Sequence, residues 1–196
     1  IRIRSEGTLA KSGTSEARTV VINAPPPPPG VFYITNEYQD PFIGYGTASG
    51  SFMNSFDVDG IYEILSEENN DQGTTKPVDD TTLLGWIYEF TGLGPRSETT
   101  LFLTARVQFG VDDSDTGFHV QFDFSGTWGT VLTIDNEDFV KEYSVGLPDD
   151  ISDTIRIRIV DNDRTIGNKE TTSLFLDQVY VSDQAQTGWN EVVIAD

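Results

Sequence analysis

The chain has 196 residues, with 32 Asp and Glu against 12 Lys and Arg, and it has no cysteine. This length suits one sizeable β domain with an appendage, and the formal net charge of −20 repels nucleic acid and anionic lipid at long range. The absence of cysteine excludes a disulfide framework, a zinc thiolate site and a cysteine nucleophile.

Residues 1–24 have the pattern of a β-hairpin. The stretch "IRIRSEG" alternates Ile and Arg with a period of two, and "ARTVVINA" follows a turn at Ser12-Gly13. Because a lone two-stranded hairpin is marginally stable in water, we expect this segment to pair with another subunit, an upstream part of the parent protein or the main domain. Four basic and two acidic side chains give residues 1–30 a charge of +2, which leaves −22 for the rest of the chain.

A run of five prolines, Pro25 to Pro29, ends at Gly30. Consecutive prolines favour the polyproline II helix, which rises about 3.1 Å per residue and acts as a stiff spacer. Residues 25–30 are therefore predicted to be a linker that leads to a main domain, residues 31–196.

The main domain is predicted to be all-β. Short apolar or alternating runs are separated by turn-forming residues, without a convincing helical period. The runs lie at residues 31–38, 60–68, 83–93, 99–110, 118–125, 128–135, 139–148, 154–161, 172–182 and 190–196. Roughly ten strands at this spacing predict two packed antiparallel sheets, a β-sandwich or jelly roll.

Period-two alternation assigns the faces of three strands. The side chains expected to point inward from the first two are Leu101, Leu103, Ala105, Val107, Phe109, Phe118, Val120, Phe122 and Phe124. His119, Gln121 and Asp123 are expected to point outward. In the strand 172–182, one face is expected to hold Phe175, Asp177, Val179 and Val181, and the other Leu174, Leu176, Gln178 and Tyr180.

Asp177 is the one acid at the centre of this last strand, and both faces around it are largely apolar. Burying an unpaired carboxylate is costly, so its charge must be neutralised. The alternatives are a protonated or hydrogen-bonded carboxyl group, an ion pair with Arg156 or Arg158 of the preceding strand, or bound Ca²⁺. The sequence leaves all three open.

Aspartate-rich turns supply further candidate ligands for Ca²⁺. Asp57 and Asp59 lie in one such turn, and Asp161 and Asp163 lie in another. Oxygen ligands suit Ca²⁺, but aspartate also favours turns because its side chain bonds to the local backbone. Neither turn matches the EF-hand loop.

Aromatic side chains near turns are candidates for sugar recognition, because an aromatic ring can stack on a pyranose face. Trp128 follows Ser125-Gly126, and Trp189 follows Gly188. We single out these two tryptophans, together with Tyr45, as candidate ligand-binding residues. Ordinary core packing is the alternative for each.

The sequence predicts no catalytic residue. His119 is the one histidine and is expected to point outward from its strand. There is no G-x-S-x-G elbow to present a serine, a two-histidine metalloprotease site needs a second histidine, and nucleotides have no glycine-rich cradle.

Two stretches, "GSFMNSFDVDGIYEILSEE" and "IRIRIVDNDRTIGNKETTSLFLDQVYVSD", resemble an accessory β-sandwich module of secreted bacterial and archaeal proteins. This module belongs broadly to the galactose-binding-like and carbohydrate-binding-module-like jelly rolls. The resemblance covers residues 31–183 and implies an extracellular or cell-surface location. In related jelly rolls a structural Ca²⁺ often joins an early strand to the last strand, which implies Asp57, Asp59 and Asp177 as its ligands here.

Residues 1–24 resemble the closing strands of type IV pilin-like proteins, in which a Y-x-I-x-S-x-G strand precedes an R-x-V/I strand. The hydrophobic N-terminal helix that defines such pilins is absent from this chain. The resemblance implies a surface filament component in which the sandwich is mounted on a proline stalk.

The function predicted from these features is that of a non-catalytic extracellular module for adhesion or for filament or pilus structure, with calcium stabilising the sandwich. Protein subunits that pair with the hairpin are the expected partners, and membrane insertion by this chain is not expected because no 18-residue apolar run occurs. The alternative hypothesis is a carbohydrate-binding module of a secreted hydrolase, with a glycan as its partner.

Overall fold

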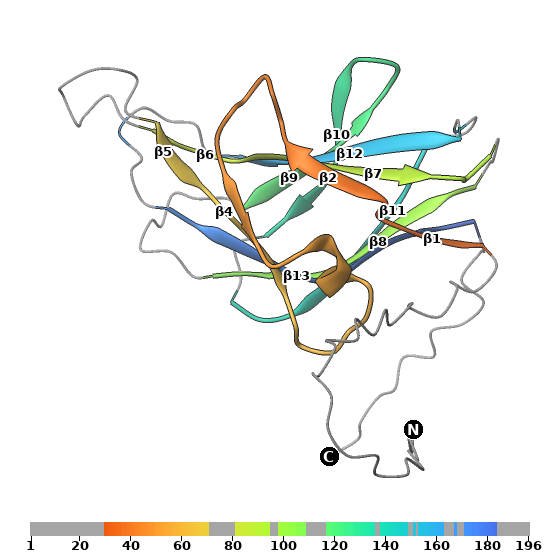
Figure 1. Cartoon of the computed structure of the whole chain (residues 1–196), viewed down its shortest axis with the longest axis horizontal. Helices are drawn as coiled ribbons and strands as arrows, with labels where there is room; N and C mark the ends of the chain where they lie inside the picture. Colours follow the sequence, from red (N-terminus) through yellow and green to blue (C-terminus); the bar gives the residue numbers. More distant parts are fainter. Residues whose placement is uncertain are drawn as a thin grey trace, which may run out of the picture.

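Two antiparallel β-sheets pack face to face in this protein. The structure is a computed structural model, and it describes residues 30–70, 81–94, 98–108, 117–135, 138–148, 151, 153–162, 167 and 171–183. Figure 1 shows β7 and β12 of one sheet above β8 and β13 of the other. The predicted all-β sandwich is confirmed.

The described strands form two large sheets and one small ribbon. Sheet A contains β1 (Val31–Tyr33), β3 (Thr47–Ser49), β4 (Glu63–Ser66), β8 (Thr100–Val107), β11 (Lys141–Gly146) and β13 (Ser173–Ser182). Sheet B contains β2 (Asn36–Gln39), β7 (Gly85–Thr91), β9 (Phe118–Asp123), β10 (Trp128–Ile134) and β12 (Thr154–Asp161). The ribbon pairs β5 (Glu68–Asn70) with β6 (Thr81–Leu83), and a 3-10 helix, η1, spans Phe52–Ser55.

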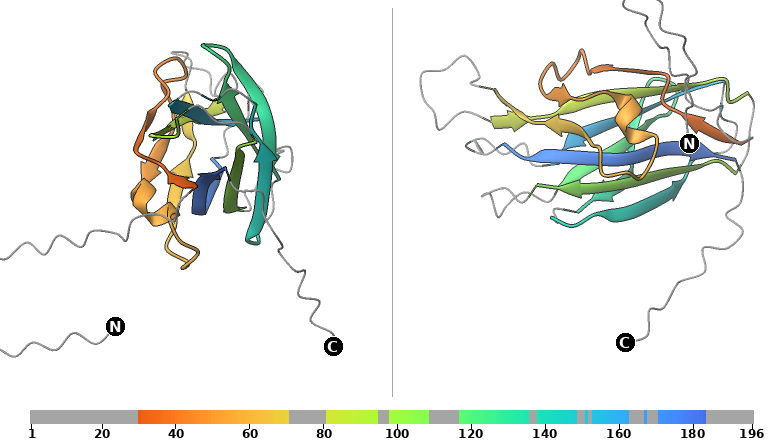
Figure 2. Two further views of the ribbon diagram at one scale, coloured as in Figure 1. Left: turned by 90° about the vertical axis from the view of Figure 1, so that its right-hand side faces the viewer. Right: turned by 60° about the horizontal axis from the view of Figure 1, so that its bottom comes forward.

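Eight strands have jelly-roll connectivity. Sheet A contains the order β11-β8-β13-β4, and sheet B contains the order β10-β9-β12-β7. Strands that follow one another in the chain therefore mostly lie in opposite sheets, as in double-sheet jelly rolls. The right view of Figure 2 shows β11, β8 and β13 side by side in sheet A.

The predicted first strand, residues 31–38, is two strands in the structure. β1 pairs with β13 in sheet A, and β2 pairs with β7 in sheet B. Between them Ile34 is buried with 2% of its surface exposed, and the Thr35 amide donates to the Glu89 carbonyl at 2.8 Å. The chain crosses from one sheet to the other here because Ile34 belongs to the core that both sheets cover.

The core confirms most of the predicted inward positions. The buried members of the predicted set are Leu101, Leu103, Ala105, Val107, Phe118, Val120 and Phe122. The prediction that Phe124 is buried is wrong, because 44% of its surface is exposed. The Phe124 ring still lies beside that of Phe122, with centroids 5.1 Å apart. Phe124 directly precedes a tight turn in which Ser125 and Gly126 have φ of 56° and 94°, so it lies at the end of the hairpin, where the core covers it only in part.

The predicted faces of the last strand are also wrong, because β13 contains a β-bulge. Its register against β8 shifts between Leu176 and Gln178, so that Asp177 is the extra residue. The bulge moves every later side chain to the opposite face. Leu174 and Leu176 are consequently buried together with Val179 and Val181.

The predicted hairpin of residues 1–24, the prolines Pro25 to Pro29, Phe109 and the predicted strand 190–196 lie outside the described residues.

Candidate functional site

The outer face of sheet B gathers polar side chains from five strands. Paired residues of neighbouring antiparallel strands point to the same side of a sheet, and Arg158 of β12 pairs with Ile87 of β7 and Gln121 of β9. Gln121 in turn pairs with Thr130 of β10. Since Ile157 and Ile159 point into the core, Arg158 and its partners lie on the solvent side.

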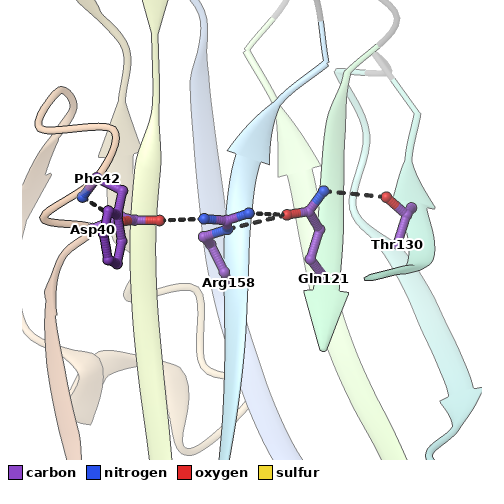
Figure 3. Close-up of polar contacts among 5 residues, drawn as sticks. All are labelled: Asp40, Phe42, Gln121, Thr130 and Arg158. Atoms are coloured by element: carbon purple, nitrogen blue, oxygen red, sulfur yellow. Dashed lines mark hydrogen bonds and ion pairs between the residues drawn. The ribbon is translucent and has the colours of Figure 1, made fainter. Parts of the chain in front are cut away.

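A row of hydrogen bonds crosses this face perpendicular to the strands (Figure 3). Arg158 Nη1 donates to Asp40 Oδ2 at 2.5 Å, and Arg158 Nε and Nη2 both donate to Gln121 Oε1, at 3.0 and 2.6 Å. Gln121 Nε2 continues the row to Thr130 Oγ1 at 3.3 Å. The guanidinium plane is thus fixed from both sides.

Asp40 holds this row at one end. Its side chain is fully buried, and its Oδ1 accepts the Phe42 amide at 2.8 Å while its carbonyl accepts the Gly44 amide at 2.7 Å. The turn therefore satisfies one carboxylate oxygen, and Arg158, with 13% of its side chain exposed, satisfies the other. A buried carboxylate needs such a partner, so the two charges stabilise each other's position.

Trp128 covers the row near its other end. The guanidinium carbon of Arg158 lies 4.6 Å from the centre of the Trp128 ring, which is a cation–π contact. Trp128 begins β10 directly after the tight Ser125-Gly126 turn, and Asp123 Oδ1 accepts the Gly126 amide in that turn at 2.5 Å. The indole is half-buried, and its orientation is set by both the turn and Arg158.

A second polar cluster on the same face is centred on Glu89 of β7. Glu89 accepts from the Asn36 amide at 3.0 Å, from the Tyr38 hydroxyl at 3.1 Å and from Arg156 Nε at 2.7 Å. The pKa of Glu89 is lowered, chiefly by the Asn36 hydrogen bond and also by Arg156 and Tyr38. The pKa of Tyr38 is raised by burial first and then by Glu89, and Glu89 raises the pKa of Arg156. At neutral pH Glu89 and Arg156 are therefore an ion pair, and the Tyr38 hydroxyl keeps its proton.

This face combines aromatic rings with planar hydrogen-bonding groups in fixed positions. Trp128 and Tyr38 lie near opposite edges of sheet B, on β10 and β2, with Arg158, Gln121 and Glu89 on the strands between them. Aromatic surface can cover the apolar face of a ring-shaped ligand, while amide, carboxylate and guanidinium groups bond to its hydroxyls. Such a surface is suited to binding sugars.

Among the predicted ligand-binding residues, Trp128 lies on this face and Tyr45 does not. The Tyr45 hydroxyl donates to Asn70 Oδ1 at 2.9 Å, beside the small ribbon. Trp189 lies outside the described residues. His119 points outward as predicted, with its Nδ1 3.1 Å from Thr133 Oγ1.

Sequence reasoning missed Asp40, and of the three alternatives that it left open for Asp177, the ion pair with Arg156 or Arg158 is not formed. The alternation in "TIRIRIVD" indicates that Arg156 and Arg158 share one face, but they pair with Glu89 and Asp40 and not with Asp177. Asp177 lies in the other sheet. The alternation did correctly place Gln121 on the outer face of β9.

The Asp177 carboxyl group accepts hydrogen bonds from backbone amides, which is one of the three alternatives that the sequence left open. Its Oδ1 accepts the amides of Asp59 and Gly60 at 3.3 and 3.0 Å, and the residue is buried with 3% exposure. The resemblance to jelly rolls correctly brought Asp177 together with the Asp57/Asp59 turn. Asp57 and Asp59 are themselves exposed in the loop 56–60, and the Asp59 side chain accepts the Ile61 amide at 2.9 Å.

The other predicted metal ligands lie elsewhere. Asp161 is buried at the end of β12 in sheet B, and Asp163 is outside the described residues. Among the side chains that the structure describes, no group of three or more His, Cys, Asp or Glu is arranged to hold a metal ion. Calcium binding stays a prediction.

No described helix has the length and apolar composition that crossing a bilayer requires.

Among the solved structures similar to this chain are carbohydrate-binding modules. Neither a protein-family model nor a curated protein matches the sequence. A mutant of the family 29 module CBM29-2 is 13% identical, with a TM-score of 0.42 over 77% of this chain and 87% of that one. CBM29_1 from Piromyces equi is 10% identical, with a TM-score of 0.43 over 79% and 89%. TmCBM61, solved in complex with β-1,4-galactotriose, is 11% identical, with a TM-score of 0.44 over 78% and 91%.

Proposed function

We propose that this protein is a non-catalytic, extracellular glycan-binding module whose binding surface is the outer face of sheet B. The observation that supports this proposal is the ordered row Asp40–Arg158–Gln121–Thr130 with Trp128 against its guanidinium group. A binding surface whose groups are already held in place loses little conformational entropy when a ligand arrives. Sugar hydroxyls would bond to the edges of these groups, and one sugar ring would pack on Trp128.

The expected glycan is neutral. Both arginines of the face are paired with carboxylates, Arg158 with Asp40 and Arg156 with Glu89, so neither offers an unopposed positive charge. The whole chain carries a formal charge of −20, which disfavours the approach of sulfated or uronic polymers. Recognition would therefore depend on hydroxyl groups and ring faces.

A glycan array followed by calorimetric titration of the strongest neutral polysaccharide tests the proposal. We expect Trp128→Ala to weaken binding by about tenfold or more, because about 1.4 kcal/mol of lost contact corresponds to a factor of ten. Phe139→Ala is the matched control, because Phe139 is an exposed aromatic residue, 60% exposed, that lies just before β11 and outside sheet B.

Two results would contradict the proposal. One is silence across all polysaccharides on the array. The other is binding that Trp128→Ala and Phe139→Ala weaken equally.

Two earlier predictions remain beside this proposal. Attachment or filament structure through residues 1–24 stays a prediction, because the hairpin lies outside the described residues. For calcium, we expect Ca²⁺ added after EDTA treatment to raise the melting temperature, because an ion that binds only the folded state stabilises it. An unchanged melting temperature would contradict the calcium prediction.

A further inference from the structure

The outer face of sheet A, on the opposite side of the sandwich, contains a cavity of about 310 Å³. Its lining comes from β8, β11, β13 and the loop 56–60, and consists of Val58, Phe102, Leu103, Thr104, Glu142, Tyr143, Ser144, Gln178 and Tyr180. This volume lies at the small end of the range for ligand pockets, about 300–1,000 Å³. We call it the sheet A groove.

One wall of the groove is aromatic, and strand register explains why. Ser144, Phe102 and Tyr180 are directly opposite one another on β11, β8 and β13. The rings of Phe102 and Tyr180 stack with centroids 4.9 Å apart and an interplanar angle of 15°. That contact uses one face of Phe102, and the neighbour on its other side is the small Ser144. A flat ligand can therefore lie over Ser144 against the other face of the Phe102 ring.

The remaining lining offers hydrogen-bonding groups of several kinds. Thr104 and Ser144 carry hydroxyls, Gln178 an amide and Glu142 a carboxylate, and Glu142 and Ser144 are exposed. A ring face beside donors and acceptors suits a pyranose. Glu142 can accept hydrogen bonds from the hydroxyls of a neutral sugar, but it would repel the carboxylate of a uronic acid.

Asp177 of β13 holds in place the loop 56–60, which forms the rim of the groove. The bulged residue Asp177 binds the Asp59 and Gly60 amides, and the next residue, Gln178, donates from Nε2 to the Phe56 carbonyl at 3.2 Å. These bonds fix the loop 56–60 against sheet A, where Val58 forms part of the lining. In the right view of Figure 2 this loop lies between η1 and β4, over β13.

We infer that the sheet A groove is a second saccharide site, which takes one neutral pyranose unit. It lies on the opposite sheet from Trp128 and Arg158, so one module would bind two separate glycan chains. This inference goes beyond the proposed function and does not depend on the sheet B site.

Nuclear magnetic resonance titrations of the ¹⁵N-labelled full chain test this inference. The probes are methyl β-glucoside, methyl β-galactoside and methyl α-mannoside, with glucuronic acid as the anionic comparison. We expect at least one neutral glycoside to shift the amide signals of Ser144 and Gln178, and glucuronic acid to leave them unmoved. Ser144→Phe, which fills the groove from an exposed position, should weaken that effect at least tenfold. Ser144→Ala, which leaves the space open, should weaken it far less.

The experiments distinguish failure of the sheet B proposal from failure of the sheet A proposal. Trp128→Ala should leave the Ser144 and Gln178 shifts intact, and Ser144→Phe should leave polysaccharide binding at sheet B intact. The second site is overturned if no neutral glycoside moves those signals, if Ser144→Phe binds like the wild type, or if glucuronic acid acts as strongly as the neutral sugars. Shifts that Trp128→Ala abolishes would likewise assign the sugar to sheet B alone.

Discussion

The two outer faces of the sandwich are organised by different interactions. On sheet B, charged and amide side chains bond to one another across the strands, from Asp40 through Arg158 to Thr130. On sheet A, aromatic rings contact one another. The ring centroids of Phe56 and Tyr33 are 4.8 Å apart, and the Tyr180 centroid lies 6.3 Å from that of Tyr33 and 4.9 Å from that of Phe102. Hydrogen bonds are directional, so the polar row on sheet B holds its side chains in fixed orientations. The aromatic contacts on sheet A instead leave apolar ring surface exposed to a ligand. The same fold can thus carry two surfaces with distinct chemistry.

The largest expected effect is on the sheet B row, through Arg158→Ala. This change leaves the fully buried Asp40 without its cation, and breaking such a buried pair costs about 3–5 kcal/mol. Arg156→Ala on the same strand is the matched control. The Arg156 side chain is 47% exposed in the pair with Glu89, so we expect a loss of about 0–1 kcal/mol. Urea unfolding measures the free energy of unfolding of both variants. Equal losses would show that the burial of Asp40 does not make its ion pair with Arg158 more important than the exposed pair.

On sheet A, the corresponding change is Asp177→Ala. It leaves the Asp59 and Gly60 amides without their acceptor, and we expect a loss of about 1–3 kcal/mol together with faster amide exchange in the loop 56–60. Asp57→Ala in the same loop changes an exposed side chain and should have an effect within about 0.5 kcal/mol. Unchanged exchange at Gly60 would mean that other contacts hold the loop.

Between the two faces, Glu63 of sheet A lies in the core beside Glu37 and Tyr88 of sheet B. Burial, with the Glu37 carboxyl next in importance, raises the pKa of Glu63 from 4.5 to about 9. The unfolded chain loses this proton near pH 4.5, whereas the folded chain keeps it until about pH 9. Stability from this group therefore falls as pH rises between those values, by at most about 1.4 kcal/mol per pH unit.

Glu63→Gln tests this link between the sheets, because an amide cannot ionise. We expect the free energy of unfolding of the variant to vary less with pH between 5 and 8 than that of the wild type, as measured by urea titration at each pH. Parallel pH profiles for the two proteins would be evidence against a protonated Glu63.

The smallest effect is expected at Glu89. Its lowered pKa means that its ion pair with Arg156 contributes stability above the unfolded pKa, and that this contribution is lost as pH falls through the folded pKa. Because the pair is partly exposed, we expect no more than about 1 kcal/mol. Comparing wild type and Glu89→Gln between pH 6 and 3 measures it. A difference between the two that does not change with acidification would contradict the expectation.

Alternation predicted the strands that pair regularly. β8 and β9 keep a period of two, and their buried side chains, from Leu101 to Val107 and from Phe118 to Phe122, follow it. The prediction failed where the backbone departs from regular pairing: at the crossing near Ile34 and at the bulge at Asp177. Each departure depends on a partner segment distant in the sequence, so no local pattern marks it.

The sequence by itself determined that the main body is an all-β sandwich, because apolar alternation between turn residues is a local property of the backbone. It also marked Asp177 as an acid needing compensation, since burial of charge is costly in any fold. Only the tertiary structure decided that backbone amides provide that compensation, and that Arg158 pairs with Asp40. The Asp59 and Gly60 amides lie 118 and 117 residues from Asp177 in the chain, and Asp40 lies 118 residues from Arg158. Only the packing of distant segments in the folded chain brings these partners together.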